Sequence, residues 1–183
     1  EILKNNKNIK ILEKAGSLGD KLSISTYLVG GYVRDILLGR DTKDIDIMVN
    51  KDSLFYAKEL SKKLNINKTV EFKKFLTARI PNKDFEIEIA NAREESYNEE
   101  SRNPEVVKET TINNDLSRRD FTINSLAVSL NKNNFGGLVD SFSGIIDLNN
   151  ALIKTPLEPD ETFKDDPLRM IRAIRFATQL EFK

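Results

Sequence analysis

Short runs of apolar and polar positions dominate the first half of the chain, and longer amphipathic runs dominate its end. Alternation with a period of two predicts strands, whereas apolar spacing of three to four residues predicts helices. The predicted strands are 24–29, 45–49, 69–75, 78–80 and 85–90, with a hairpin turn at 81–84. The predicted helices are 2–22, 32–38, 53–64, 121–130 and 166–180.

Two further segments have weaker patterns. Residues 93–114 are polar with little apolar periodicity, which predicts a mobile loop. Residues 138–140 and 152–154 are predicted to form a short strand pair around a small helix near Ile145.

The order of the elements indicates the fold class. Strands come first and helices come late, without regular alternation, which predicts an α+β domain over 1–154 and the start of a helical domain over 155–183. The chain begins at Glu1 rather than Met and stops just after its last predicted helix, so we expect it to belong to a longer protein.

Composition narrows the possible chemistry. The chain has 183 residues, 39% hydrophobic and 32% charged, without a signal peptide or the roughly 20 apolar residues that span a bilayer, so we expect a cytoplasmic protein. Cys and His are absent, which excludes disulfides and disfavours zinc sites and histidine chemistry. A metal ion would be held by oxygen atoms, which favours Mg²⁺, Mn²⁺ or Ca²⁺. Basic and acidic residues balance at 29 each, so RNA binding would need clustered basic groups or contacts elsewhere.

Asp44 and Asp46 flank Ile45 in a predicted strand. Alternate residues of a strand share a face, so the two carboxylates point the same way, about 6 to 7 Å apart. Carboxylates this close repel each other unless a cation lies between them, and hard divalent cations suit such a pair. A solvated acidic strand face is the alternative.

Gly30 and Gly31 separate a predicted strand from a predicted helix. Glycines at this place let a phosphate approach the backbone, and the helix N-terminus adds N–H donors. Arg34 offers its planar fork to a triphosphate. An ordinary strand-to-helix turn would explain the same residues.

Glu86 and Glu88 share one face of another predicted strand. If this strand neighbours the strand of Asp44 and Asp46, one glutamate completes a trio of carboxylates. A solvated sheet face fits the segment equally well.

Arg118 and Arg119 precede a predicted helix that begins with Asp120 as its cap or first-turn acid. Asn124 would lie one turn later on the same face. The two arginines could then face a phosphate. A capped surface helix is the alternative.

The last predicted helix starts with Asp166 as N-cap and Pro167 in its first turn. Asp166 and Arg169 lie three residues apart and together offer an acceptor and donors to the Watson–Crick edge of a base. Arg169, Arg172 and Arg175 spread over one face. The alternative is a cap with an intrahelical salt bridge, worth under ~0.5 kcal/mol.

The order and spacing of these motifs resemble one enzyme family. From Leu28 to Phe176, the blocks LVGGYVRDILLGRDTKDIDIMV, FEIEIANAR, RRDFTINSLA, DSFSGIIDL and DDPLRMIRAIRFA are similar to class II tRNA nucleotidyltransferases and bacterial poly(A) polymerases. The resemblance implies a polymerase-β-like nucleotidyltransferase fold, with a mixed β-sheet backed by helices. It makes residues 1–154 the head and 155–183 the beginning of a helical neck.

The resemblance also implies roles for individual residues. Asp44 and Asp46 would hold Mg²⁺, and Glu88, rather than Glu86, would help to activate the 3′-hydroxyl of the primer. The residues that match nucleotide-binding positions are Gly30, Gly31 and Arg34 for phosphates, Arg119, Asp120 and Asn124 for the ribose and triphosphate, Asp166 and Arg169 for the base, and Arg172 in support.

The chain departs from the family pattern at two places. Asp165 stands where Glu is usual, and Ser141 and Ser143 stand where Pro and a second Gly are usual. The first change shortens a carboxylate side chain by one methylene group, and it would affect the support of Asp166 and Arg169, the pair that the resemblance assigns to reading the base. The second bears on the hinge between CTP-bound and ATP-bound shapes.

These matches predict template-independent addition of CCA, from CTP and ATP, to tRNA 3′ ends by two-metal nucleotidyl transfer. A poly(A) polymerase, or an enzyme that adds only C or only A to tRNA or another RNA, shares the same motifs. A non-catalytic nucleotide- or RNA-binding module is the alternative from another class, and the three carboxylates disfavour it. A small-molecule nucleotidyltransferase is disfavoured by the base-reading pair. The sequence leaves the oligomeric state open and predicts no membrane partner.

Overall fold

The computed structural model describes residues 2–66, 68–98 and 101–183. The chain divides into two compact units, which we call unit 1 (Glu1–Ala92 and Ala127–Val139) and unit 2 (Arg93–Leu126 and Asp140–Lys183). The boundary predicted after residue 154 divides a head from a helical neck, which is a different division from that into these two units. It stays a prediction. Within the described ranges, no helix combines the length and apolar character needed to cross a membrane.

Unit 1 is built on a seven-stranded mixed sheet with the order β3-β4-β5-β2-β1-β8-β9. Its strands are β1 (Thr26–Val29), β2 (Asp44–Val49), β3 (Val70–Phe72), β4 (Thr77–Pro81), β5 (Glu86–Asn91), β8 (Ala127–Ser129) and β9 (Leu138–Val139). Strands β2 and β5 run parallel, and the other neighbours run antiparallel. The predicted α+β class with a mixed sheet is confirmed.

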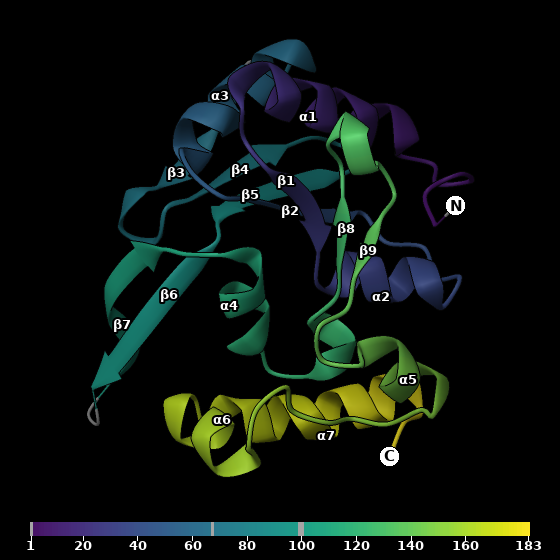
Figure 1. Cartoon of the computed structure of the whole chain (residues 1–183), viewed down its shortest axis with the longest axis vertical. Helices are drawn as coiled ribbons and strands as arrows, with labels where there is room; N and C mark the ends of the chain where they lie inside the picture. The colour runs from purple at the N-terminus through teal and green to yellow at the C-terminus, as the bar shows by residue number, and fades with distance from the viewer. Residues whose placement is uncertain (1, 67, 99–100) are drawn as a thin grey trace. The chain divides into compact units, whose positions relative to one another are not determined.

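The core of unit 1 lies between the sheet and two helices. Helices α1 (Ile9–Leu22) and α3 (Ser53–Lys63) lie side by side against the sheet (Figure 1). The hydroxyl of Tyr56 on α3 donates a 2.7 Å hydrogen bond to the carbonyl of Ala15 on α1, and burial raises the pKa of Tyr56. The apolar positions of the two central strands, Ile45, Ile47, Ile87 and Ile89, are all buried. The acidic positions that alternate with them therefore lie on the opposite face.

Helix α1 approaches its neighbours closely because it carries two glycines. A Cβ atom added to Gly16 would lie 1.8 Å from the carbonyl oxygen of Leu130, and one on Gly19 would lie 2.3 Å from Thr26 Oγ1. No side chain fits at such distances, so the packing of α1 depends on glycine.

Unit 2 contains a two-stranded antiparallel sheet and several short helices. Its elements are β6 (Arg93–Asn98), β7 (Ser101–Glu109), α4 (Ile112–Ser117), the 3-10 helix η2 (Thr122–Asn124), α5 (Gly144–Asn149), α6 (Pro159–Asp165) and α7 (Leu168–Leu180). The rings of Phe121 and Phe176 meet edge to face with centroids 5.9 Å apart. This contact joins α7 to the segment before η2.

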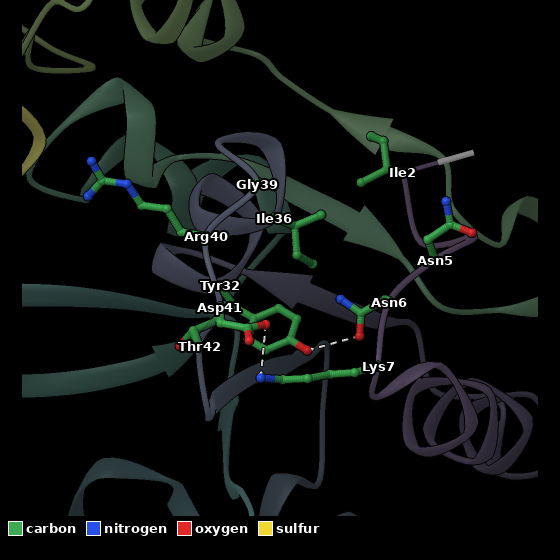
Figure 2. Close-up of a pocket in the computed structure, with 10 residues that line it drawn as sticks. All are labelled: Ile2, Asn5, Asn6, Lys7, Tyr32, Ile36, Gly39, Arg40, Asp41 and Thr42. Carbon is green, nitrogen blue, oxygen red and sulfur yellow. Dashed lines mark hydrogen bonds and ion pairs between the residues drawn. The ribbon is translucent and has the colours of Figure 1, made fainter.

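The first helix begins later than its pattern predicts, at Ile9 rather than residue 2. The N–H of Asn8 donates to Asn6 Oδ1 at 2.9 Å, and both asparagine side chains bond to the hydroxyl of Tyr32. These side-chain bonds hold the preceding residues in turns instead of a helix. The same segment lines a pocket of about 270 Å³ beside α2 (Gly31–Leu37), whose described lining includes none of the predicted site residues (Figure 2).

The predicted helix over 121–130 is wrong. Its start forms only the single turn of η2, and its second half is strand β8, which pairs with β1 inside the sheet. All three residues of β8 are buried, so the pairing partner decides the conformation of this short apolar run. The predicted strand over 69–75 is also too long, because β3 ends at Phe72 and the 3-10 helix η1 (Lys73–Phe75) follows.

The predicted loop over 93–114 is wrong as well. This segment contains β6, β7 and the start of α4, although residues 99–100 lie outside the described part of the chain. Strands β6 and β7 pair through their backbones with an irregularity between Ser96 and Asn98. Backbone pairing needs no apolar periodicity, so the pattern of side chains did not reveal it.

The predicted strand pair of 138–140 with 152–154 does not form. Strand β9 pairs with β8 instead, and the N–H of Ile153 donates to the carbonyl of Lys183 at 2.8 Å. The small helix near Ile145 is confirmed as α5. Helix α6 was missed, although Pro159 in its first turn and the acidic Asp160 after it are typical of a helix start.

Gly16→Ala is expected to lower the free energy of unfolding by about 2 kcal/mol, because the new methyl group would overlap the Leu130 carbonyl. A glycine-to-alanine change inside a helix otherwise raises stability by ~0.5–1 kcal/mol, so the sign is diagnostic. Urea denaturation followed by circular dichroism measures the effect. Lys14→Ala, an exposed change on the same helix, should stay within ~0.5 kcal/mol of the parent protein. Stabilisation by Gly16→Ala would contradict the close packing of α1.

Candidate active site

Four carboxylates lie on neighbouring strands of unit 1. Strands β2 and β5 pair so that Asp44 stands opposite Glu86 and Asp46 stands opposite Glu88. Paired residues of adjacent strands share a face, and the strands lie about 4.8 Å apart. The two strands are thus neighbours. A glutamate was predicted to complete a trio of carboxylates with Asp44 and Asp46 if this condition were met.

Arg79 on β4 stands directly opposite Glu88 on β5. Its Nε donates to Glu88 Oε2 at 2.8 Å, and its Nη1 lies 3.8 Å from Glu86 Oε1. The hydrogen bond to Glu88 raises the pKa of Arg79, and the charges of Glu86 and Asp46 act in the same direction. The sequence reasoning missed this residue. The alternation of Arg79 with the apolar residues Ala78 and Ile80 could have indicated its position, because neighbouring residues of a strand point to opposite faces and Arg79 therefore lies on the face away from the core.

The donor set suits a hard divalent cation, because it consists of carboxylate oxygens on one sheet face. In the described part of the chain, no three acidic side chains gather closely enough to hold a single metal ion. Glu88 is engaged by Arg79 in this arrangement. Residue type and strand pairing therefore fit Mg²⁺, and Glu88 would turn toward the aspartates to complete the trio.

Gly30, Gly31 and Arg34 form a compact turn where β1 meets α2. Gly30 has φ 69° and ψ −140°, a conformation that residues with a side chain rarely adopt. The Arg34 guanidinium is buried, pairs with Asp35 at 2.8 Å, and curls back so that a Cβ on Gly31 would lie 3.4 Å from its Nη2. Arg34 thus lies against the glycine turn, and phosphate binding by these residues stays a prediction.

Arg118 and Arg119 in unit 2 both bind Asp115. Asp115 is 2% exposed, accepts from Arg118 Nη2 at 2.8 Å, and accepts from Arg119 Nη2 and Nε at 3.2 and 3.3 Å. The sequence reasoning missed Asp115, although its spacing of three and four residues from the arginines is typical of helical ion pairs. A contact between these arginines and phosphate stays a prediction.

Asp120 is the centre of a hydrogen-bond network in unit 2. Its Oδ1 accepts from the N–H of Phe121 at 2.8 Å and from Asn124 Nδ2 at 3.0 Å. Its Oδ2 accepts from Arg172 Nε at 2.8 Å and Nη2 at 2.5 Å. Asp120 and Asn124 were predicted to share one face of a helix, and they are bonded to each other although η2 replaces that helix.

Asp166 and Arg169 mark the start of α7. Asp166 Oδ1 accepts from the N–H of Leu168 at 3.0 Å, but α7 begins at Leu168 with Pro167 as its N-cap residue, so Asp166 lies one position before the cap that was predicted for it. Arg169 is buried and donates to the carbonyls of Thr162 at 3.2 Å and Arg118 at 2.7 Å. Within the described residues, Asp166 and Arg169 form no ion pair, so the salt-bridge alternative is wrong. Base recognition by the pair stays a prediction.

Residues 140–144, where the sequence departs from the family pattern, form a tight turn in unit 2. Asp140 accepts from the N–H groups of Gly144 at 2.6 Å and Ile145 at 3.0 Å. Ser143 has φ 59°, a left-handed conformation that favours glycine. Serine in this conformation costs roughly 1 kcal/mol relative to glycine.

Comparison with known proteins points to one family. The model of the poly A polymerase head domain matches residues 26–154. An A-adding tRNA nucleotidyltransferase from Aquifex aeolicus is 41% identical over 160 residues, covering 87% of this chain and 19% of the relative. A CCA-adding enzyme from Ligilactobacillus salivarius is 38% identical over 179 residues, covering 97% of this chain and 41% of the relative.

Solved structures agree with these matches. A CCA-adding enzyme in an apo form superimposes with a TM-score of 0.87 and 40% identity, over 100% of this chain and 43% of that one. A tRNA nucleotidyltransferase complexed with a primer tRNA and an incoming ATP analog has a TM-score of 0.80 and 36% identity, over 92% of this chain and 46% of that one. The chain spans less than half the length of these relatives.

Arg172→Met is expected to lower the free energy of unfolding by about 2 kcal/mol, because buried Asp120 would lose both guanidinium hydrogen bonds. Arg175→Met is a matched control, since both guanidinium groups lie over the Phe176 ring, at 5.3 and 4.7 Å from its centroid. The control should cost under about 1 kcal/mol. Equal losses in urea denaturation would show that the bond to Asp120 contributes nothing.

Proposed function

The chain belongs to the poly(A) polymerase head domain family, and from this membership we propose that it is the catalytic part of an enzyme that adds nucleotides to tRNA 3′ ends. The observation that carries the proposal is the pairing of β2 with β5, which aligns Asp44, Asp46 and Glu88 on one face. Relatives named A-adding tRNA nucleotidyltransferase and CCA-adding enzyme support tRNA as the acceptor. The proposed place of action is the cytoplasm.

The proposed reaction is in-line attack of an RNA 3′-hydroxyl on the α-phosphate of a nucleoside triphosphate, with pyrophosphate leaving. Asp44 and Asp46 would hold Mg²⁺, and Glu88 would help to orient and activate the attacking hydroxyl. The chemistry that bound Mg²⁺ supplies is neutralisation of charge on the attacking and leaving oxygens. The protein would contribute mainly by positioning the reactants.

The remaining residues would select the nucleotide. Gly30, Gly31 and Arg34 are proposed to contact the triphosphate. In unit 2, Arg119, Asp120 and Asn124 are proposed to contact the ribose and triphosphate, with Arg172 supporting Asp120.

Base selection is assigned to Asp166 and Arg169. The carbonyls of Thr162 and Arg118 fix the plane of the Arg169 guanidinium, which has five N–H donors in a rigid fork. A fixed fork three residues after the Asp166 acceptor suits the Watson–Crick edge of a base.

We propose CCA addition from CTP and ATP, in line with relatives that are named CCA-adding enzymes. Addition of A alone is the second candidate, because relatives from Aquifex aeolicus and Geobacter sulfurreducens are named A-adding. Incubation of the full-length protein with tRNA that lacks its 3′ end, offered CTP, ATP or both, separates the two. Incorporation from ATP only, onto tRNA ending in CC, would favour the second candidate.

Asp46→Asn in the full-length protein is expected to reduce nucleotide addition roughly 1,000-fold, because metal stabilisation of several kcal/mol would be lost. Asp84→Asn, in the exposed turn between β4 and β5, is the matched control and should keep full activity. Thermal unfolding of both variants should stay close to that of the parent protein. Normal activity of Asp46→Asn would refute the assignment of Asp46 to the metal.

Asp166→Asn is expected to change the ratio of CTP to ATP incorporation without weakening α7, because the amide oxygen of asparagine can still accept from the N–H of Leu168. The change replaces a carboxylate acceptor with an amide that also donates. Single-turnover rates with each nucleotide measure the ratio, and Asp160→Asn at an exposed position of α6 is the control. Equal losses for CTP and ATP would contradict a role in base selection.

A further inference from the structure

Arg79 has no part in the proposed reaction, although it lies beside the carboxylates that do. It stands opposite Glu88 on one side of β5, and Asp46 stands opposite Glu88 on the other side. The three side chains thus form a row across β4, β5 and β2 on the face away from the core. Glu88, in the middle, has a cation on one side and a carboxylate on the other.

Several contacts hold Arg79 in this row. Its Nε bond to Glu88 Oε2 measures 2.8 Å, its Nη1 lies 3.8 Å from Glu86, and its guanidinium lies over the Phe72 ring at 5.5 Å. Contacts from β3 and β5 therefore fix the position of one positive charge among four carboxylates. Such a charge offsets their mutual repulsion.

We propose that Arg79 is a positioning residue that takes the place of the divalent cation while the carboxylates hold none, and that it releases Glu88 when the metal binds. In the described part of the chain no three acidic side chains converge, which is the arrangement expected while Arg79 holds Glu88. Arg79 and the metal then compete for one carboxylate. This inference rests on the proposed function, in which Asp44, Asp46 and Glu88 act with Mg²⁺.

The competition predicts the direction of a change in metal affinity. Arg79 weakens metal binding both by holding Glu88 and by repelling a second cation. Repulsion between a unit charge and a divalent cation about 6 Å apart in water corresponds to roughly a tenfold change in affinity. Removing Arg79 should therefore tighten metal binding by more than tenfold at low salt, because the release of Glu88 adds to the loss of repulsion.

The test is a titration of the full-length protein with Mn²⁺, in which electron paramagnetic resonance measures the unbound ion without any need for turnover. Arg79→Met is expected to bind Mn²⁺ more than tenfold more tightly than the parent protein. Arg79→Lys keeps the charge and should return to within about threefold of the parent. If Arg79→Met does not fold, Arg79→Gln replaces it as the neutral variant.

Two controls separate competition from a general effect of charge. Lys83→Met removes a positive charge from the exposed turn between β4 and β5 and should leave the Mn²⁺ affinity unchanged. In a Glu88→Gln background, the effect of Arg79→Met should fall to the roughly tenfold change that repulsion alone gives, because the contested carboxylate is gone.

The outcomes are distinct. Unchanged or weaker Mn²⁺ binding by Arg79→Met, with binding that still depends on Asp46, would overturn the role of Arg79 and leave the proposed function standing. Absence of any Mn²⁺ binding that depends on Asp46, in the parent and in every variant, would overturn the proposed metal site and this inference with it.

Discussion

The parallel pairing of β2 with β5 is the interaction on which the candidate site depends. It buries Ile45 and Ile47 beside Ile87 and Ile89, and the same alternation brings four carboxylates together on the opposite face. Burial of each isoleucine contributes roughly 1.5–3 kcal/mol, whereas two like charges 4 Å apart in water repel by about 1 kcal/mol. The apolar face therefore decides the pairing. On the acidic face the carboxylates repel one another, and a cation can offset this repulsion.

Arginine meets such requirements throughout the described chain. Glu88 is bound by Arg79, Asp120 by Arg172, and Asp115 by Arg118 and Arg119. In a sequence without His or Cys, the planar guanidinium is the group that can satisfy a carboxylate and also fix its orientation. Asp115 and Asp120 are nearly inaccessible to water, so their arginine partners supply the hydrogen bonds that water cannot and also neutralise the carboxylate charge.

Sequence patterns predicted the strands of Asp44 and Glu88 because a period of two is a strong local signal, and both strands are confirmed. The family resemblance supplied the residues of the candidate site, and their roles remain proposals. Patterns failed where a distant partner decides the structure. Residues 127–129 form a strand because they pair with β1. Arg79 contacts Glu88 because the register of β4 with β5 places the two residues opposite each other. Register between strands that are far apart in sequence is set by tertiary packing, which a local pattern does not contain.

The division of the chain into interleaved segments has a consequence for how it can come apart. Each unit is assembled from two separate stretches, so the backbone passes between the units after Ala92, after Leu126 and after Val139. A protease that cuts the chain once at one of these junctions always divides at least one of the two units. A nick after Ala92 divides unit 1, a nick after Val139 divides unit 2, and a nick after Leu126 divides both, so the two pieces of a divided unit would have to associate in order to fold.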